Sequence, residues 1–400
     1  MTTQQLLDEI VIPRPNGSEG MTQVASFVEA TLQRQGAEVT HHTFIATPYG
    51  FQLLWGTILL LVLAWAIALH FRRYRLAWIP LLLAPVLMVV EMEFLWSPVS
   101  GLLPANEDNI IGVFAGRDNG PTLIFTAHYD TATNFGDHFE WYRWGVSLGP
   151  ALLVAAVLTL AGARRGRLRW TVGLAGTGLV LIPFAAMAWF FVAGPWLRTP
   201  SPGALDNGGA VAVLLQLGDR LATRRNPAAT VQLVFLAAEE ERALGSWHYA
   251  ATLDPHTSVA VINLETVGSA GPLAYAPEEG FQLFRYPAAP SLVALLNRVA
   301  QARGEHLAEQ ALPAGVITDG RSFLAHGIPA ITLLSMFADG FPRDLHSASD
   351  DRSRLSVSAL DALVDFLMSV VDQVDRMPHM LGHPQLHSPA PSSERHQQPR

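Results

Sequence analysis

Several side chains of the kinds that bind metals stand at the ends of apolar, strand-like runs in this 400-residue sequence. His128 and Asp130 end the run TLIFTAHYD, and Glu265 ends the run SVAVINLE. Asp206 lies in GALDNGGA, just before an apolar helical stretch. Imidazole nitrogen and carboxylate oxygen are the donors that Zn²⁺ and similar cations take from proteins. These residues could therefore form a metal centre.

Three consecutive glutamates, Glu239 to Glu241, follow a buried strand predicted for Val231–Leu236. Because like charges repel at this spacing, the run either forms a solvated turn or surrounds a cation. His346, in DLHSASDD, follows a further strand-like run, AITLLS. In open parallel sheets, ligands bind outside the carboxyl ends of the strands. Five such stretches together predict a pair of cations with nitrogen and oxygen ligands.

The segments that carry these residues alternate between strand-like and helix-like patterns. Strands are predicted at NIIGVFAG, TLIFTAH, VQLVFLAAEE, SVAVINLE and AITLLS, and helices at 24–32, 210–221 and 359–374. This alternation predicts an α/β fold, a three-layer α/β/α sandwich with a mostly parallel central sheet. Residues 377–400 are rich in proline, serine and histidine. They predict a disordered tail, although its histidines could also bind a metal.

Apolar residues are concentrated in four runs, in a chain that is 50% hydrophobic and only 15% charged. The runs are Phe51–Leu69, Leu76–Trp96, Trp144–Ala163 and Trp170–Trp196. A helix needs ~20 residues to cross a bilayer, and each run has a similar length, with Trp or Tyr near its ends. We expect two transmembrane helical hairpins, 51–96 and 144–196, inserted into one α/β domain formed by residues 1–50, 97–143 and 197–376.

The turns of both hairpins are rich in arginine, in HFRRYR and RRGRLR. Because positive charge in short loops stays cytoplasmic, the α/β domain and both termini should be extracytoplasmic. Every basic side chain other than histidine is an arginine, and Ala, Gly and Pro are abundant. This composition suggests a G+C-rich bacterial genome. We therefore expect an integral protein of a bacterial plasma membrane.

Composition also excludes several kinds of chemistry. The chain has no cysteine and no lysine, which excludes thiolate metal sites, cysteine nucleophiles, Schiff bases and a Walker-type phosphate loop. A net charge of −8 without a basic stripe argues against nucleic acid as a partner.

The order of the motifs resembles the co-catalytic di-zinc aminopeptidase family. The shared pattern is HxD, then GAxDN, then AEE followed by GS, then an acidic strand end, then HS with a later Asp. That family includes bacterial leucyl aminopeptidases, glutamate carboxypeptidases and Fxna-type membrane metallopeptidases. The similarity extends from about Ile12 to Arg376, with the hairpins as insertions, and includes PRPNGSEG and GIPAITLLS.

The resemblance implies a role for each motif residue. Asp206 would bridge two zinc ions, His128 and Glu265 would complete one site, and Glu240 and His346 would complete the other. A shared anionic ligand suits two cations that lie ~3.5–4 Å apart and activate one water. The family also implies a cis peptide between Asp206 and Asn207.

The two remaining motif residues would be catalytic without being ligands. Glu239 would be the general base, which must reach the water while staying free of the metals. Asp130 would orient His128, and Glu241 is expected to be a solvated neighbour. The chain departs from the family pattern at Glu265, where most members have Asp. It also departs at Arg242 and Ala243, which replace Gly-Leu and are expected to reshape the pocket wall.

The sequence thus predicts a membrane-anchored di-zinc metallopeptidase, an aminopeptidase, whose partners are a peptide or protein substrate and the lipid bilayer. Two alternatives share the scaffold: a glutaminyl-cyclase-like zinc acyltransferase, which works with one metal, and a non-catalytic membrane receptor. Glu91 and Glu93 lie near the end of a span, which favours anchors over a transport path. The hairpins are therefore either passive anchors or a means of presenting substrates at the membrane surface.

Overall fold

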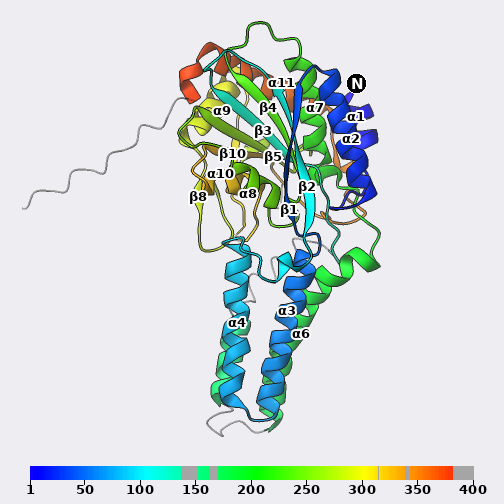
Figure 1. The fold of residues 1–400 in the computed structure, drawn as a ribbon, viewed down its shortest axis with the longest axis vertical. Coiled ribbons are helices and arrows are strands. Elements are labelled where there is room, and N and C mark those ends of the chain that lie inside the picture. The colour runs from blue at the N-terminus through cyan, green and yellow to red at the C-terminus, as the bar shows by residue number, and fades with distance from the viewer. Residues whose placement is uncertain (137–150, 163–169, 314, 338–341, 382–400) are drawn as a thin grey trace, which may run out of the picture.

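A computed structural model describes residues 1–136, 151–162, 170–313, 315–337 and 342–381. Figure 1 shows an α/β domain above a bundle of long helices, with the first residues of the chain at the top of the α/β domain. The long helices leave the domain at one end, below the strands. The domain and the bundle are therefore stacked end to end.

The α/β domain is built on an eight-stranded sheet with the order β1-β2-β4-β3-β5-β10-β6-β9. The strands are β1 Glu38–Ala46, β2 Ala105–Phe114, β3 Thr122–His128, β4 Thr230–Leu236, β5 Val259–Glu265, β6 Leu273–Tyr275, β9 Ala308–Glu309 and β10 Ala330–Ser335. A separate pair is formed by β7 Glu278–Glu279 and β8 Tyr286–Pro287. The central strands β4, β3, β5 and β10 are mutually parallel, so their carboxyl ends meet at one edge of the sheet.

Helices cover both faces of the sheet. They are α1 Thr3–Ile10, α2 Glu19–Arg34, α7 Gly209–Leu221, α8 Leu244–Ala250, α9 Pro290–Ala302, α10 Asp319–Ala325 and α11 Val357–Arg376. Helices α1, α2, α7, α9 and α11 share one apolar core with the sheet, whereas α8 and α10 pack in the core of the other face.

The alternation of side chains along the central strands explains these two cores. In β3, Leu123 and Phe125 belong to the core of the five-helix face, and Ile124 between them belongs to the core of the other face. In β4, the neighbours Leu233 and Val234 are divided between the two cores in the same way. Successive side chains of a strand point to opposite faces, so a strand that is apolar throughout must be covered on both sides. The predicted three-layer α/β fold is confirmed.

The second part of the molecule consists of apolar helices. Three are long enough to cross a membrane: α3 Gly50–His70 with 21 residues, α4 Tyr74–Met92 with 19, and residues Gly176–Leu197, 22 residues of α6 Trp170–Leu197. A further apolar helix, Ala151–Gly162, is shorter. The predicted run 144–163 lies partly outside the described residues, so the structure shows three helices of spanning length rather than four.

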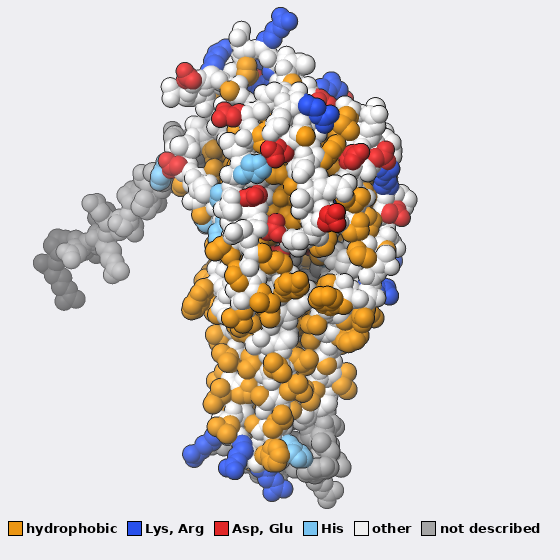
Figure 2. All heavy atoms as spheres, turned by 45° about the vertical axis from the view of Figure 1, so that its right-hand side comes forward, with side chains coloured by type: hydrophobic (Ala, Val, Ile, Leu, Met, Phe, Trp, Pro, Cys, Tyr) orange, Lys and Arg blue, Asp and Glu red, His pale blue; other side chains and the backbone are white. Residues whose placement is uncertain are grey.

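The surface of the helical part matches its composition. Figure 2 shows hydrophobic side chains covering the lower half of the molecule, with arginines at its lower tip and acidic side chains on the α/β domain. Residues such as Leu60, Ile79 and Ile182 expose more than 60% of their surface there. A surface of this kind is typical of helices that face lipid.

The first hairpin is inserted between two paired strands of the sheet. Helices α3 and α4 lie between β1 and β2, which pair along their whole length as antiparallel neighbours. Strand β1 was not predicted from the sequence. At the carboxyl end of the chain, Pro378–Leu381 form a short 3₁₀ turn that places Leu381 in the core. The rest of the predicted tail, from residue 382, lies outside the described residues.

Candidate metal centre

The predicted site residues meet at the carboxyl edge of the central strands. His128 and Glu265 are the last residues of β3 and β5, and the glutamates follow β4. Asp206 lies in an irregular turn, Ala204–Gly208, that leads into α7, and His346 lies in the loop after β10. Parallel strands bring their carboxyl ends together, which explains how residues so far apart in the sequence converge.

Two clusters of ligand atoms share one residue. His128, Asp206 and Glu265 form the first, and Asp206, Glu240 and His346 form the second, each with its ligand atoms within 4.8 Å of one another. His128 Nε2 lies 3.1 Å from Asp206 Oδ1 and 3.7 Å from Glu265 Oε1. His346 Nε2 lies 3.0 Å from Asp206 Oδ2 and 2.9 Å from Glu240 Oε2. The two oxygens of Asp206 therefore face one cluster each.

Asp206 is held by contacts to its backbone and its neighbour. The side chain of Asp350 accepts hydrogen bonds from the backbone N–H groups of Leu205, at 2.8 Å, and of Asp206, at 3.1 Å. The peptide bond between Asp206 and Asn207 is cis, as the resemblance implies. Asn207 Nδ2 donates to the carbonyl oxygen of Leu264, which directly precedes the ligand Glu265.

Asp130 connects the histidine to the glutamate loop. Its Oδ1 lies 3.4 Å from His128 Nδ1 and accepts a hydrogen bond from the backbone N–H of Glu239. Its Oδ2 accepts from the backbone N–H of Glu240 and from Asn16 Nδ2. One carboxylate therefore faces the ring of a candidate ligand and fixes the turn that carries the candidate base.

Glu239 belongs to neither cluster but faces the first. Its Oε2 lies 4.0 Å from His128 Nε2, and its side chain lines the cleft above the clusters. The preceding residue, Ala238, has a φ of 54°, a left-handed conformation that turns the chain sharply at the strand end. Gly245 makes this turn feasible, since a Cβ there would lie 2.0 Å from the carbonyl oxygen of Ala237. This contact explains the GS that follows the AEE motif.

Comparison with known families agrees with this geometry. Residues 188–371 match the family described as peptidase family M28. The match includes Asp206, Glu239, Glu240, Glu265 and His346, whereas His128 lies upstream of it. No curated protein shows significant sequence similarity to the chain.

Three solved structures have folds similar to that of this chain. A glutaminyl cyclase from Porphyromonas gingivalis has a TM-score of 0.54 and 16% identity, over 93% of this chain and 95% of that chain. A Zn-dependent exopeptidase from Parabacteroides distasonis has a TM-score of 0.54 and 15% identity, over 92% and 96%. An aminopeptidase from an Aneurinibacillus strain has a TM-score of 0.55 and 14% identity, over 93% and 92%. Family and fold together support a metallopeptidase.

The electrostatics of the site favour a bound cation. Burial raises the pKa of Glu239 and of Glu240 above the ordinary value, and it raises the pKa of Glu265 to about 7. Burial alone would lower the pKa of His128 and His346, but the carboxylates around them raise it well above the usual range. Without a cation, the site therefore compensates its crowded carboxylates by holding protons.

The donor set fits divalent transition metals such as zinc. Each cluster offers one imidazole nitrogen and carboxylate oxygens, the ligands typical of catalytic zinc sites. His128 Nε2 and Glu265 Oε2 are buried and have no hydrogen-bond partner in the described part of the chain. Buried polar atoms in native proteins are normally paired, so these two need a partner that the protein itself does not supply. A metal ion would satisfy both.

One sequence-based expectation about the glutamate loop is wrong, and a second is incomplete. Glu241 is not solvated: it is buried, its Oε2 accepts a hydrogen bond from the backbone N–H of Thr47, and burial raises its pKa to about 8. Arg242 does more than shape the pocket wall. Its side chain is 1% exposed and its Nη1 donates to Glu91 Oε2 at 2.8 Å. Both residues contact the segments at the two ends of the first hairpin, Glu241 through Thr47 and Arg242 through Glu91.

Sequence reasoning assigned no role to three supporting residues. Arg14 is completely buried and donates to the carbonyl oxygens of Tyr129, Pro202 and Gly203, which joins the strand end beside His128 to the turn of Asp206. Asn16 bridges Asp130 and the N–H of Ala238. Asp350 holds the backbone of Asp206. The first two lie in PRPNGSEG, whose resemblance to a family segment was the available signal.

Proposed function

We propose that this chain is a membrane-anchored di-zinc aminopeptidase. The observation that carries the proposal is the pair of ligand clusters sharing Asp206, with Glu239 beside them and outside both. Two zinc ions per chain would be held by His128, Asp206 and Glu265, and by Asp206, Glu240 and His346. Such ions polarise a peptide carbonyl and lower the pKa of water, which makes water a nucleophile near neutral pH.

The side chains of the site have distinct tasks in this proposal. Glu239 takes the proton of the attacking water and delivers it to the leaving amine, as water adds to the carbonyl carbon and the C–N bond breaks. Burial raises the pKa of Glu239, which brings its carboxylate closer to the basicity that proton transfer near pH 7 requires. Asp130 keeps His128 oriented. The products are a free amino acid and a shortened peptide.

A variant of Glu239 tests this assignment. Glu239→Gln should retain both metals and lose turnover of aminoacyl substrates by about 10²–10⁴-fold, because only the base is removed. The matched control is Glu9→Gln, an exposed glutamate of α1. Metal content is measured by elemental analysis and turnover with a panel of aminoacyl and acylated peptides. Near-normal activity of Glu239→Gln with two bound metals would refute the mechanism.

The glutaminyl cyclase fold similarity supports one alternative, cyclisation of an amino-terminal glutamine. The two complete ligand clusters support the hydrolase instead. Peptides that begin with glutamine distinguish them. We expect release of the amino acid, whereas a cyclised product with ammonia release and one metal per chain would favour the acyltransferase.

The apolar helices support an anchor in the bilayer, and the arginine-rich turns support an extracytoplasmic α/β domain. The lack of native cysteine makes a clean test of this orientation. Phe71→Cys at the arginine-rich turn and Thr257→Cys on the α/β domain place single thiols on exposed residues. In intact cells, a membrane-impermeant maleimide should label only the second. Labelling of Phe71→Cys alone would place the enzyme in the cytoplasm.

A further inference from the structure

The cleft above the metal clusters continues into the membrane-helix bundle. The cleft has a volume of about 520 Å³, and a second cavity of about 360 Å³ lies among the apolar helices. Both volumes are in the range of small-molecule binding sites. Four residues line both spaces: Trp55, Met88, Phe191 and Phe281. These four residues connect the two spaces, and we call them the neck.

The neck is built from packed rings and flexible side chains. Phe191 of α6 stacks on Trp55 and on Phe51 of α3, with ring centroids 5.3 Å apart in both pairs. Met88 comes from α4, and Phe281 comes from the α/β domain. Phe281 belongs to the same apolar cluster as the membrane helices. The neck therefore joins the two parts of the molecule with an apolar lining.

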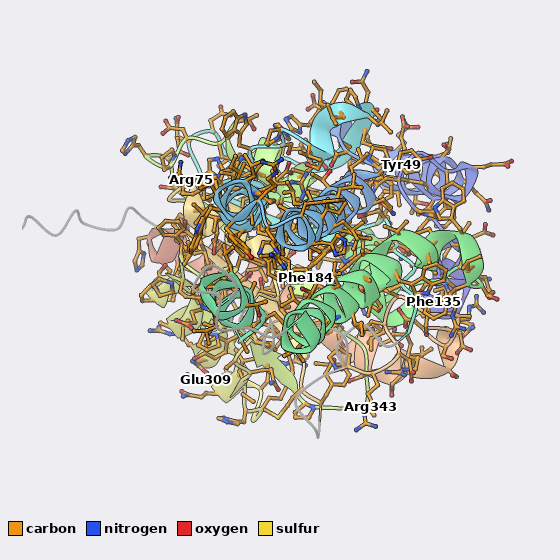
Figure 3. The ribbon with its side chains drawn as sticks, turned by 90° about the horizontal axis from the view of Figure 1, so that it is seen from below. Tyr49, Arg75, Phe135, Phe184, Glu309 and Arg343 are labelled. Atoms are coloured by element: carbon orange, nitrogen blue, oxygen red, sulfur yellow. The ribbon has the colours of Figure 1, made fainter. Side chains whose placement is uncertain are left out.

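The lower cavity is lined almost entirely by apolar side chains. Its walls are formed by α3, α4, α6 and the helix Ala151–Gly162, with Ile58, Leu81, Ala84, Ala156 and Phe184 among the lining residues. Seen from below, these helices surround a common centre, and Phe184 lies between them (Figure 3). The cleft above the neck is lined by the carboxylates of the metal clusters and by His346. The combined space is thus polar at one end and apolar at the other.

We propose that the lower cavity binds a fatty-acyl chain covalently attached to the peptide substrate. This inference rests on the proposed peptidase function and names its substrate class, lipid-modified peptides. The scissile peptide bond lies at the metal clusters, and the hydrocarbon passes the neck into the bundle. The reaction is the same hydrolysis: water adds, the C–N bond breaks and the acyl bond stays intact.

An acyl chain suits this cavity better than a peptide segment. A peptide entering an apolar space must satisfy its backbone N–H and C=O groups internally, which requires a helix. A helix with side chains is about 10–12 Å wide, too wide for a 360 Å³ cavity that continues through a neck of side chains. A hydrocarbon chain has no polar groups to satisfy and gains from leaving water. The cavity lies within helices of membrane-crossing length, where such chains already reside.

The experiment compares two peptides with free amino termini that carry either a palmitoyl or an acetyl group on the same downstream side chain. In nanodiscs, we expect kcat/KM to favour the palmitoyl peptide by at least about tenfold, since burying even two methylenes contributes that much. Ala84→Trp and, separately, Ala156→Phe fill the lower cavity and should reduce this ratio to near one. Ala64→Trp, on the exposed face of α3, is the control and should keep it.

A binding readout separates this inference from the proposed function. A photoactivatable palmitoyl peptide should cross-link to residues of the lower cavity in the Glu239→Gln protein, and excess unlabelled palmitoyl peptide should compete. Equal competition by a palmitoyl phospholipid would overturn the inference, because the cavity would then be a gap filled by bilayer lipid. An equal preference for both peptides would do the same while leaving peptidase function intact. Turnover of neither peptide, with cross-linking retained, would refute the proposed function alone.

Discussion

A buried ion pair fastens the first hairpin to the glutamate loop, and removing its negative charge should be costly. Arg242 Nη1 donates to Glu91 Oε2 at 2.8 Å and to the carbonyl oxygen of Glu91 at 3.1 Å. Its Nη2 donates to the hydroxyl groups of Thr47 and Ser97, both at 3.1 Å. The side chains of Arg242 and Glu91 are 1% and 0% exposed. The perturbation is Glu91→Gln, which keeps the shape and removes the charge.

The loss of stability depends on which hydrogen-bond partners the remaining residue keeps after each substitution. After Glu91→Gln, the guanidinium of Arg242 retains only neutral acceptors in a buried place. Breaking a buried pair in this way costs about 3–5 kcal/mol. After Arg242→Met, by contrast, the carboxylate of Glu91 still accepts from the backbone N–H of Val99 and from the N–H and hydroxyl of Ser100. We therefore expect Arg242→Met to cost less than Glu91→Gln.

Thermal unfolding of the purified protein in detergent measures the effect. For Glu91→Gln, we expect a fall in Tm on the order of 10 °C and a loss of peptidase activity, because Arg242 follows the loop of the base. The matched control is Asp365→Asn, which removes a charge from an exposed pair with Arg220 and should cost less than about 1 kcal/mol. A Glu91→Gln protein as stable as this control would refute the reasoning. The double variant Glu91→Leu/Arg242→Met should recover much of the loss.

Three further outcomes are expected. Burial, then the charge of Asp130, raises the pKa of Glu107 to about 7, so the folded chain keeps this proton between about pH 4.5 and 7 while the unfolded chain loses it. Stability due to Glu107 therefore falls across that window, and Glu107→Gln should raise Tm relative to the unmodified protein more at pH 8 than at pH 5. A chelator should lower Tm, and added zinc should restore it, because ions that bind only the folded state stabilise it. Asp350→Asn should weaken metal affinity by about 10–100-fold in a competition titration, since Asp350 holds the backbone of Asp206.

The candidate site could be predicted from the sequence because its ligands sit where strands end. His128 and Glu265 are the last residues of parallel strands that pair as neighbours, so a common edge brings them together without any further information. The motif order then assigned Asp206, Glu240 and His346 to two clusters, and the structure groups the same residues. The roles of base and ligand remain predictions until Glu239 and the metals are tested.

The contacts that support the site could not be predicted in this way. Glu91 lies near the end of a predicted span, and its partner Arg242 is 151 residues away. Arg321 donates to the carbonyl oxygens of Met92 and Glu93, which are 229 and 228 residues away. The periodicity of apolar residues is a local pattern, so it does not predict contacts between elements that are distant in sequence. Strand β1 was missed because its exposed residues give it only a weak apolar pattern.

The second hairpin is also connected to the candidate metal centre, through hydrogen bonds. The backbone N–H of Asn134 donates to the carbonyl oxygen of His346, and Asn134 Nδ2 lies 2.8 Å from His346 Nδ1. The next residue, Phe135, donates its N–H to the carbonyl oxygen of Phe190 in α6. Two successive residues thus contact a candidate ligand and a membrane helix.

These contacts show how α4 and α6 could influence the candidate site. Helix α4 ends at the partner of Arg242, and α6 ends at Leu197, nine residues before Asp206. Helix α4 is therefore joined to the loop of the candidate base by the Arg242 ion pair, and α6 is joined to the turn of Asp206 by a short segment of chain. A displacement of α4 or α6 would move these catalytic elements with it. For this reason, we expect substitutions in α4 or α6 to alter turnover. If these helices were a passive tether, such substitutions would affect only the attachment of the protein to the membrane.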